Sequence, residues 1–339
     1  MVFCLYIKKT LVAQGHRHFS TVCACKISEL SVPVPWGEIR GRVWGPDHGR
    51  PVLCLHGWAD NCGSFSTLIP LLPRDCRYVA VDLAGHGRSS HRPPGVFYSI
   101  LEYVADVCRV ANALQLKKFS IMGHSMGEYT RRFTVLYPEM VDALIFLDAY
   151  GLLPVDVKDI SKVMRKEMEK MLQFDKNMDR KERVYTYEKA VERLLAANPM
   201  LSLQSVHILL ERGLAQVEGG NMLFILCFQK NAFGLSLEQC LETQMRIQAS
   251  VLVVLAEDGF HKIFSEPSLK KFTSAFLQSL QHRNHTVVTV PGDHHVHLNN
   301  PELVAPLVSD FLRTKVCAGE SYCLDGGCLT DLTEETEAR

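Results

Sequence analysis

Phe119-Ser-Ile-Met-Gly-His-Ser-Met-Gly127 is the stretch that decides the fold of this chain. A short apolar run of strand length leads into a Gly-x-Ser-x-Gly motif with Ser125 at its centre. This pattern, followed by a segment of helical length, is typical of a nucleophile elbow, a strained strand-to-helix turn that projects a serine hydroxyl. Gly123 and Gly127 suit such a turn because they lack the Cβ atoms that would clash there. A plain turn would also satisfy these five residues, so the interpretation depends on the surrounding sequence.

Continuous apolar runs on both sides of this motif predict buried strands. Unbroken rather than alternating hydrophobicity is typical of strands covered on both faces. Two further strand-like runs at the start of the chain suit a hairpin at the edge of a sheet. Because strands alternate with helical segments, we predict an α/β fold with a mostly parallel, eight-stranded sheet flanked by helices. The predicted strands are residues 27–34, 38–44, 51–57, 78–83, 119–122, 143–147, 250–255 and 285–290, and the predicted helices of this part include 64–72, 100–116, 268–280 and 301–313.

The predicted elements divide the chain into four parts. Residues 27–151 and 246–316 together form the expected core domain. Residues 152–245 have long helical patterns and a strand signal only at 222–228, so we predict a helical cap over the mouth of the site. Residues 1–26 are basic and contain no acidic residue, which predicts either an organelle transit peptide or a disordered N-terminus. Residues 317–339 are Gly-rich and then acidic, which predicts a disordered tail.

The overall composition favours a small-molecule substrate as the partner. Lys+Arg and Asp+Glu number 37 each, so no excess charge draws the chain to nucleic acid or to an anionic membrane. No apolar run reaches the roughly 18 to 20 residues of a membrane span, which predicts no transmembrane segment. The 12 cysteines are scattered, and several fall inside apolar patterns as free thiols do. We therefore expect an intracellular location, in the cytoplasm, a mitochondrion or a peroxisome, rather than secretion; the sequence leaves the oligomeric state open.

A serine nucleophile needs a general base, and the candidate lies near the end of the chain. Val290-Pro-Gly-Asp-His-His-Val-His-Leu-Asn-Asn-Pro301 lies between a predicted strand and a predicted helix, where a loop can return an imidazole to the end of the sheet. His294 follows the Gly-Asp turn and is the preferred base, with His295 and His297 as alternatives. Structural histidines are the second interpretation. A metal site ranks third because the sequence shows no further ligand at metal spacing, so we predict no metal and no cofactor.

Two aspartates could hold the imidazole in its reactive orientation. Asp258 follows the predicted strand 250–255, and Asp148 follows the strand 143–147. Both strand ends open toward the expected cleft, and both preserve the chain order serine, acid, histidine. We take Asp258 as the acid and Asp148 as the alternative, although either could equally cap a helix or bind a turn.

Backbone N–H groups are expected to form the oxyanion hole. One donor is the N–H of the residue after the nucleophile, Met126. The other is the N–H of Trp58, in the loop His56-Gly57-Trp58 that follows the strand 51–57. The Trp58 ring could also form a pocket wall or part of the core.

Together these motifs resemble the α/β-hydrolase fold. Asp82-Leu-Ala-Gly-His-Gly-Arg-Ser-Ser90 and Gly292-Asp-His294 match that superfamily. Within it, Val34-Pro-Trp-Gly37, Leu53-Cys-Leu-His-Gly-Trp58, Leu68-Ile-Pro-Leu-Leu-Pro73 and Tyr137-Pro-Glu-Met-Val141 are similar to the serine hydrolase-like proteins of vertebrates. The resemblance spans residues 27–315 and implies a hydrolase. Superfamily members include esterases, lipases and C–C hydrolases, while dehalogenases and epoxide hydrolases typically place Asp where this chain has Ser125, so the serine favours ester-type hydrolysis.

Two departures from the family pattern give a second hypothesis. Glu128-Tyr-Thr-Arg-Arg132 places three charges and a large ring where the family has small residues, and Asp258 lies one position earlier than the usual acid. Either Glu128 pairs with Arg131 or Arg132 at helical spacing, or the elbow is distorted. We therefore predict a serine hydrolase that cleaves an ester-like bond of a small hydrophobic substrate through an acyl-enzyme. The alternative is a catalytically impaired protein of this fold that serves as a binding or scaffold protein.

Overall fold

The computed structural model describes residues 27–317 except 94, 97, 126, 151–153, 177–183, 217–221, 225–234, 264–266 and 282–284. The predicted N-terminal segment 1–26 and nearly all of the predicted tail 317–339 therefore lie outside the described residues. Among those that are described, no helix combines the length and the apolar character needed to cross a bilayer.

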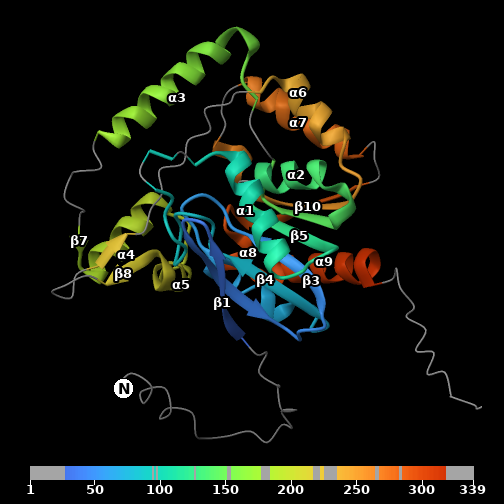
Figure 1. Ribbon diagram of the computed structural model, residues 1–339. Coiled ribbons are helices and arrows are strands. Elements are labelled where there is room, and N and C mark those ends of the chain that lie inside the picture. Colours follow the sequence, from blue (N-terminus) through green and yellow to red (C-terminus); the bar gives the residue numbers. More distant parts are fainter. Residues whose placement is uncertain are drawn as a thin grey trace, which may run out of the picture.

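An eight-stranded sheet forms the centre of the molecule, as predicted (Figure 1). Its strands lie in the order β1-β2-β4-β3-β5-β6-β10-β11, and every neighbouring pair from β4 to β11 is parallel. Strand β2 runs antiparallel to both β1 and β4, so the predicted hairpin does lie at the sheet edge. The strands are β1 (Ile27–Val34), β2 (Gly37–Trp44), β3 (Arg50–Leu55), β4 (Cys76–Val81), β5 (Phe119–His124), β6 (Val141–Leu147), β10 (Ser250–Asp258) and β11 (Thr286–Asp293).

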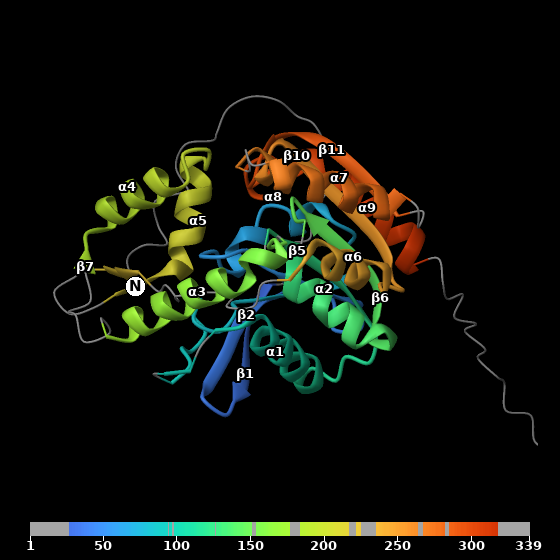
Figure 2. The ribbon, with the colours of Figure 1, turned by 90° about the horizontal axis from the view of Figure 1, so that it is seen from above.

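Helices cover both faces of this sheet, which is why its strands are apolar throughout (Figure 2). On one face, alternate strand residues such as Leu53 and Val79 pack in one core cluster with α1 (Ile100–Ala113), α2 (Gly127–Leu136) and α7 (Pro267–Gln281). On the other face, Val52 and Ala80 pack with the short turn η1 (Cys62–Phe65) and with α9 (Pro301–Leu312). Residues 64–72, predicted as a helix, form only the two short turns η1 and η2 (Ile69–Leu71), because Pro70 and Pro73 lack the N–H groups that a longer helix requires.

Most of the chain between β6 and β10 lies beside the sheet, as α4, α5 and three short strands show, whereas α6 at its end packs with α2 and α7 on the sheet (Figures 1 and 2). This segment contains more than the predicted helices, because three short strands pair antiparallel in the order β7-β9-β8. Residues 222–224 of the predicted strand at 222–228 form β9, and residues 225–228 lie outside the described residues. Strands β7 and β8 are too short to leave a sequence pattern. Its elements are α3 (Ile160–Asp175), β7 (Val184–Tyr185), α4 (Tyr187–Ala197), α5 (Leu203–Gly213), β8 (Leu214–Gln216), β9 (Met222–Phe224) and α6 (Leu237–Met245).

A buried arginine fastens α5 to the core. Arg212 is fully buried, and its Nη2 lies 2.8 Å from Asp82 Oδ2, while its Nη1 lies 2.9 Å from Glu29 Oε1 on β1. The Asn61 side chain also donates to the Leu209 carbonyl of α5 at 2.8 Å. Burial would raise the pKa of the Asp82 carboxyl, but the charge of Arg212 and hydrogen bonds from Arg212 and two backbone N–H groups lower it below its usual value. The end of the insertion nearest the sheet is thus held by a satisfied ion pair.

Candidate active site

Ser125 lies on the turn between β5 and α2 in a backbone conformation that serine rarely adopts. Its φ angle is +56°, in the left-handed region, and its N–H donates to the Leu147 carbonyl at 3.2 Å. Gly123 is required there because a Cβ at this position would come within 2.7 Å of Thr130 Oγ1. The close approach of α2 to β5 therefore explains the first glycine of the motif, and the strained turn presents the Ser125 hydroxyl at the end of the strand.

His294 meets this hydroxyl from the far end of the sequence. It follows β11 directly, and its Nε2 lies 2.8 Å from Ser125 Oγ. The Phe260 ring stacks on the imidazole with the ring centres 5.1 Å apart. On its other side, His294 Nδ1 lies 2.6 Å from Asp148 Oδ2. Since a carboxylate only accepts, Nδ1 carries the hydrogen, and in the neutral ring Nε2 keeps the lone pair that can take the serine proton.

Asp148 is the residue that orients His294. Its carboxylate is buried and also accepts the Ala256 N–H at 3.0 Å and the Phe260 N–H at 2.7 Å. Burial would raise the pKa of this carboxyl, but the hydrogen bond and charge of His294 and the two backbone donors lower it below its usual value. Gly259 makes room for the group, because a Cβ at that position would lie 2.4 Å from both carboxylate oxygens.

The structure does not bring Asp258, the preferred acid, to His294. Asp258 is exposed at the end of β10, where the pairing register with β11 shifts after Ala256, and its carboxylate pairs with Lys262. The alternative Asp148 takes the position beside His294 instead. The sequence offered no usable signal for this choice, because the reason for Gly259, whose missing side chain leaves the space that Asp148 fills, becomes visible only in the structure.

The two alternative bases lie behind His294 rather than beside Ser125. His295 Nε2 is 3.4 Å from Asp60 Oδ2, and the His297 ring is fully buried 4.2 Å from the ring of His124. Burial lowers the pKa of His297 well below its usual value. Burial would also lower the pKa of His295, but the negative charge of Asp60 raises it instead.

Sequence reasoning missed two members of this buried group. Asp60 follows the loop after β3, and its pKa is well below the usual value because the attraction of His295 and His124 outweighs the effect of burial. His124, expected only as a packing residue, is buried at the end of β5, and burial lowers its pKa to about 4. Neither residue shares a spacing motif with His295, so only the fold brings them together.

The predicted oxyanion loop packs against the nucleophile. A Cβ on Gly57 would come within 2.9 Å of Ser125 Cβ, so this loop touches the elbow directly. His56 fixes the loop: its Nδ1–H donates to the Gly57 carbonyl at 2.7 Å, and its Nε2 accepts the Leu83 N–H at 3.0 Å. Trp58 follows, with 58% of its surface exposed. Met126, the other predicted donor, lies outside the described residues.

Two of the large residues after the elbow, Tyr129 and Arg131, are accommodated in the core. Tyr129 is buried and donates its hydroxyl to the His56 carbonyl, which ties α2 to the oxyanion loop. Arg131 is fully buried, and its Nη1 lies 3.5 Å from the Cys240 carbonyl of α6. The Glu128 side chain is not described, so its predicted pairing remains a prediction.

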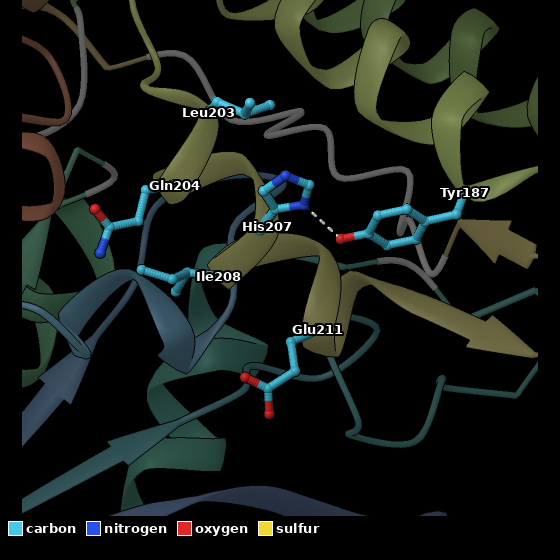
Figure 3. A pocket seen from close by; sticks show the side chains of 6 residues that line it. All are labelled: Tyr187, Leu203, Gln204, His207, Ile208 and Glu211. Atoms are coloured by element: carbon cyan, nitrogen blue, oxygen red, sulfur yellow. Dashed lines mark hydrogen bonds between the residues drawn. The ribbon is translucent and has the colours of Figure 1, made fainter. Parts of the chain in front are cut away.

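A separate open hollow of about 740 Å³ lies between α4 and α5 (Figure 3). Across it, the Tyr187 hydroxyl lies 2.6 Å from His207 Nδ1, and the two rings are stacked. The residues that line it are Tyr187, Leu203, Gln204, His207, Ile208 and Glu211. None of these residues contacts Ser125, His294 or Asp148 through a hydrogen bond, so the hollow is distinct from the Ser125 site.

Comparisons with known proteins bear on the fold and on the class of activity. Residues 50–301 match the family model described as the alpha/beta hydrolase fold. A serine hydrolase-like protein of Danio rerio is 53% identical over 304 residues, which cover 88% of this chain and 92% of that protein. The human serine hydrolase-like protein 2 is 38% identical, over 85% of this chain and 94% of that protein. A solved structure of a hypothetical protein from Pseudomonas aeruginosa is 29% identical with a TM-score of 0.74, over 84% of this chain and 99% of that one. These similarities support a hydrolase.

Proposed function

Because this chain belongs to the α/β-hydrolase family, as its motifs predicted, we propose that it is a serine hydrolase that cleaves ester-like bonds. The observation that carries the proposal is the continuous hydrogen-bond chain from Ser125 through His294 to Asp148, with distances of 2.8 and 2.6 Å. Such a chain activates a hydroxyl that is otherwise too weakly acidic to attack a carbonyl.

The reaction proceeds in two halves. As Ser125 Oγ bonds to the carbonyl carbon, its proton passes to His294 Nε2, and the ionised Asp148 stabilises the imidazolium that forms. His294 then gives this proton to the leaving alkoxide, the C–O bond to the alcohol breaks, and an acyl-enzyme remains. Water repeats the sequence: His294 takes its proton, the hydroxide attacks the acyl carbon, and Ser125 leaves with the proton returned from His294.

The oxyanion of each tetrahedral intermediate is assigned to the N–H groups of Trp58 and Met126. The packing of Gly57 against Ser125 Cβ supports the first of these, because Trp58 is the next residue in the chain. Donors fixed in advance at such a position contribute about 3 to 4 kcal/mol each to transition-state stabilisation in comparable sites. The exposed Trp58 ring at this edge favours a substrate with an apolar acyl or alcohol part.

The alternative of an impaired scaffold protein rested on residues 128–132. The contacts of Tyr129 and Arg131 weaken it, because these side chains are buried with hydrogen-bonding partners while the hydrogen-bond distances of the triad remain short. A hydrolase is therefore the better supported function.

Labelling with a fluorophosphonate probe tests the proposal. The wild-type chain should form a stable adduct at Ser125, and Ser125→Ala should abolish labelling while its circular dichroism stays unchanged. Ser279→Ala is the matched control, because Ser279 lies on α7 with its hydroxyl bonded to the Phe276 carbonyl, and this variant should label like wild type. A folded wild-type protein that fails to label and fails to hydrolyse any activated ester would refute the proposal and favour the scaffold.

A further inference from the structure

Three ligand-type side chains converge behind His294 from three different parts of the chain. They are Asp60 after β3, His124 at the end of β5, and His295 at the start of the short helix α8 (Val296–Asn299). All three are at least nine-tenths buried. Asp60 Oδ2 lies 3.3 Å from His124 Nδ1 and 3.4 Å from His295 Nε2, and the three atoms lie within 4.8 Å of one another.

Two of these atoms face each other without a hydrogen bond. His124 Nε2 lies 2.9 Å from the His294 carbonyl, and because a carbonyl only accepts, Nε2 carries the hydrogen. In the neutral ring Nδ1 then presents a lone pair toward Asp60 Oδ2, which is also electron-rich. Neither His124 Nδ1 nor Asp60 Oδ2 has a hydrogen-bond partner among the described residues. Buried polar atoms rarely lack a hydrogen-bond partner, because each unsatisfied atom destabilises the fold by about 1 to 3 kcal/mol.

Two of the three separations between these atoms are those of a metal site. Bonds of about 2.1 Å to nitrogen and oxygen at tetrahedral angles separate neighbouring ligand atoms by roughly 3.4 Å. Two of the three separations already have this value. We propose that Asp60, His124 and His295 bind one divalent transition-metal ion of the zinc class, directly behind His294.

The donor set selects the class of ion. Two imidazole nitrogens and one carboxylate oxygen suit Zn²⁺, Co²⁺, Ni²⁺ or Cu²⁺, whereas Ca²⁺ and Mg²⁺ prefer oxygen ligands alone. An ion pair between Asp60 and His295 alone would leave the lone pair of His124 Nδ1 facing the Asp60 carboxylate. A metal ion bound by all three side chains would give each of these atoms a partner. Gly57 borders the gap, and a Cβ there would come within 2.9 Å of His124 Nδ1 and 3.3 Å of Asp60 Oδ2.

Occupancy of this site should act on His294, and this step rests on the proposed hydrolase function. The His124 ring lies 4.7 Å from the His294 ring, and His295 is the next residue in the chain. A tetrahedral metal ion holds its ligand atoms about 3.4 Å apart, whereas His124 Nδ1 and His295 Nε2 lie within 4.8 Å of one another. Metal binding therefore draws these two nitrogens together if they start farther apart than about 3.4 Å. Because both residues contact His294, we expect the metal to disturb the bond between His294 and Ser125 and to lower hydrolysis.

Metal binding can be measured without turnover. Chelator-treated full-length protein is titrated with Co²⁺ and followed by visible absorption, and then with Zn²⁺ by calorimetry. We expect one ion per chain, with the strong visible bands of tetrahedral Co²⁺ and without the sulfur-to-cobalt charge-transfer band that cysteine ligands would produce. Asp60→Asn and His295→Gln should each weaken binding at least about tenfold, the lower end of what changing even an outer-shell partner costs. His207→Gln, which removes a histidine outside the cluster, should bind like wild type.

The outcomes separate this proposal from the function proposed above. Wild-type protein that binds no ion, that shows the sulfur charge-transfer band, or that binds no better than folded Asp60→Asn and His295→Gln would overturn the metal site. If these variants do not fold, the wild-type Co²⁺ spectrum decides alone. Tetrahedral bands without the sulfur band support the proposal, and either no binding or a sulfur band overturns it. Ester hydrolysis and probe labelling are measured on the metal-free protein, so a failure of the hydrolase proposal appears there and leaves the binding result intact.

Discussion

Replacing Asp148 with asparagine is the sharpest test of the assignment of the acid. Oδ2 of Asp148 accepts two hydrogen bonds, from His294 Nδ1 at 2.6 Å and from the Phe260 N–H at 2.7 Å, and Oδ1 accepts the Ala256 N–H at 3.0 Å. An amide group replaces one of these acceptors with a donor. In either orientation at least one buried backbone N–H loses its acceptor, which should destabilise the fold by about 1 to 3 kcal/mol.

The two orientations of the amide set the range of the effect on turnover. If the amide nitrogen replaces Oδ1, His294 keeps its tautomer, but its hydrogen bond runs to a neutral oxygen instead of a charged one, a loss of about 1.3 kcal/mol or roughly tenfold in rate. If it replaces Oδ2, it faces His294 Nδ1 and favours the tautomer with hydrogen on Nε2, which cannot take the proton of Ser125. That outcome costs about 10⁴-fold by analogy with the triad of serine proteases.

The assay is the hydrolysis of an activated ester such as a p-nitrophenyl ester, with kcat and KM measured for each variant and unfolding followed in urea. Asp148→Asn should lower kcat at least about tenfold. Asp258→Asn is the matched control, because its exposed pair with Lys262 contributes only about 0 to 1 kcal/mol, and its kcat should stay near that of wild type. If Asp148→Asn keeps its activity while Asp258→Asn loses it, the role assigned to Asp148 is wrong.

Three further predictions concern the surroundings of the site. Gly259→Ala should lower kcat at least about tenfold, because its Cβ would lie 2.4 Å from both oxygens of Asp148; ester hydrolysis measures this. Arg212→Met should reduce the free energy of unfolding by about 3 to 5 kcal/mol, since it leaves the buried Asp82 without its charged partner; urea unfolding measures it. Finally, burial lowers the pKa of His86 to about 3, so below its ordinary value of 6.5 the unfolded state binds a proton that the folded state does not. His86 should therefore lower stability by about 1.4 kcal/mol per pH unit between these two values as the pH falls, and His86→Gln should unfold in acid at a lower pH.

Each of these predictions has a control or a result that contradicts it. Gly213→Ala places its Cβ at an ordinary 3.7 Å from Asn61 Nδ2 and should keep its activity. Arg246→Met breaks only an exposed pair with Glu242 and should cost no more than about 1 kcal/mol. Equal unfolding free energies for Arg212→Met and Arg246→Met would contradict the structural role of Arg212. An acid-unfolding midpoint that does not move in His86→Gln would show that other groups control acid stability.

The sequence predicted the sheet well because its strands are buried on both faces. An unbroken apolar run such as residues 51–55 leaves few other possibilities, and the structure places it at the centre of the sheet as β3. Patterning was less informative outside the sheet. Strands β7 and β8 have two and three residues, too few for an alternating pattern, and residues 64–72 contain a helical period that Pro70 interrupts.

The site could be predicted only as far as its motifs extend. Ser125 and His294 stand in recognisable local patterns, and the structure brings them together. The acid has no motif of its own: two aspartates end neighbouring parallel strands, and the choice between them depends on a register shift near Ala256 that no pattern encodes. Asp60 and His124 were missed for the same reason: the segment after β11 brings His295 to them across β6 and β10, which no spacing in the sequence indicates.

The contact between Gly259 and Asp148 also constrains how such a protein can evolve. A carboxylate at position 148 and any side chain at position 259 would occupy the same volume, so the two positions cannot change independently. An aspartate at the end of β6 therefore requires glycine at 259, and only a chain with a smaller residue at 148 has room for a side chain there.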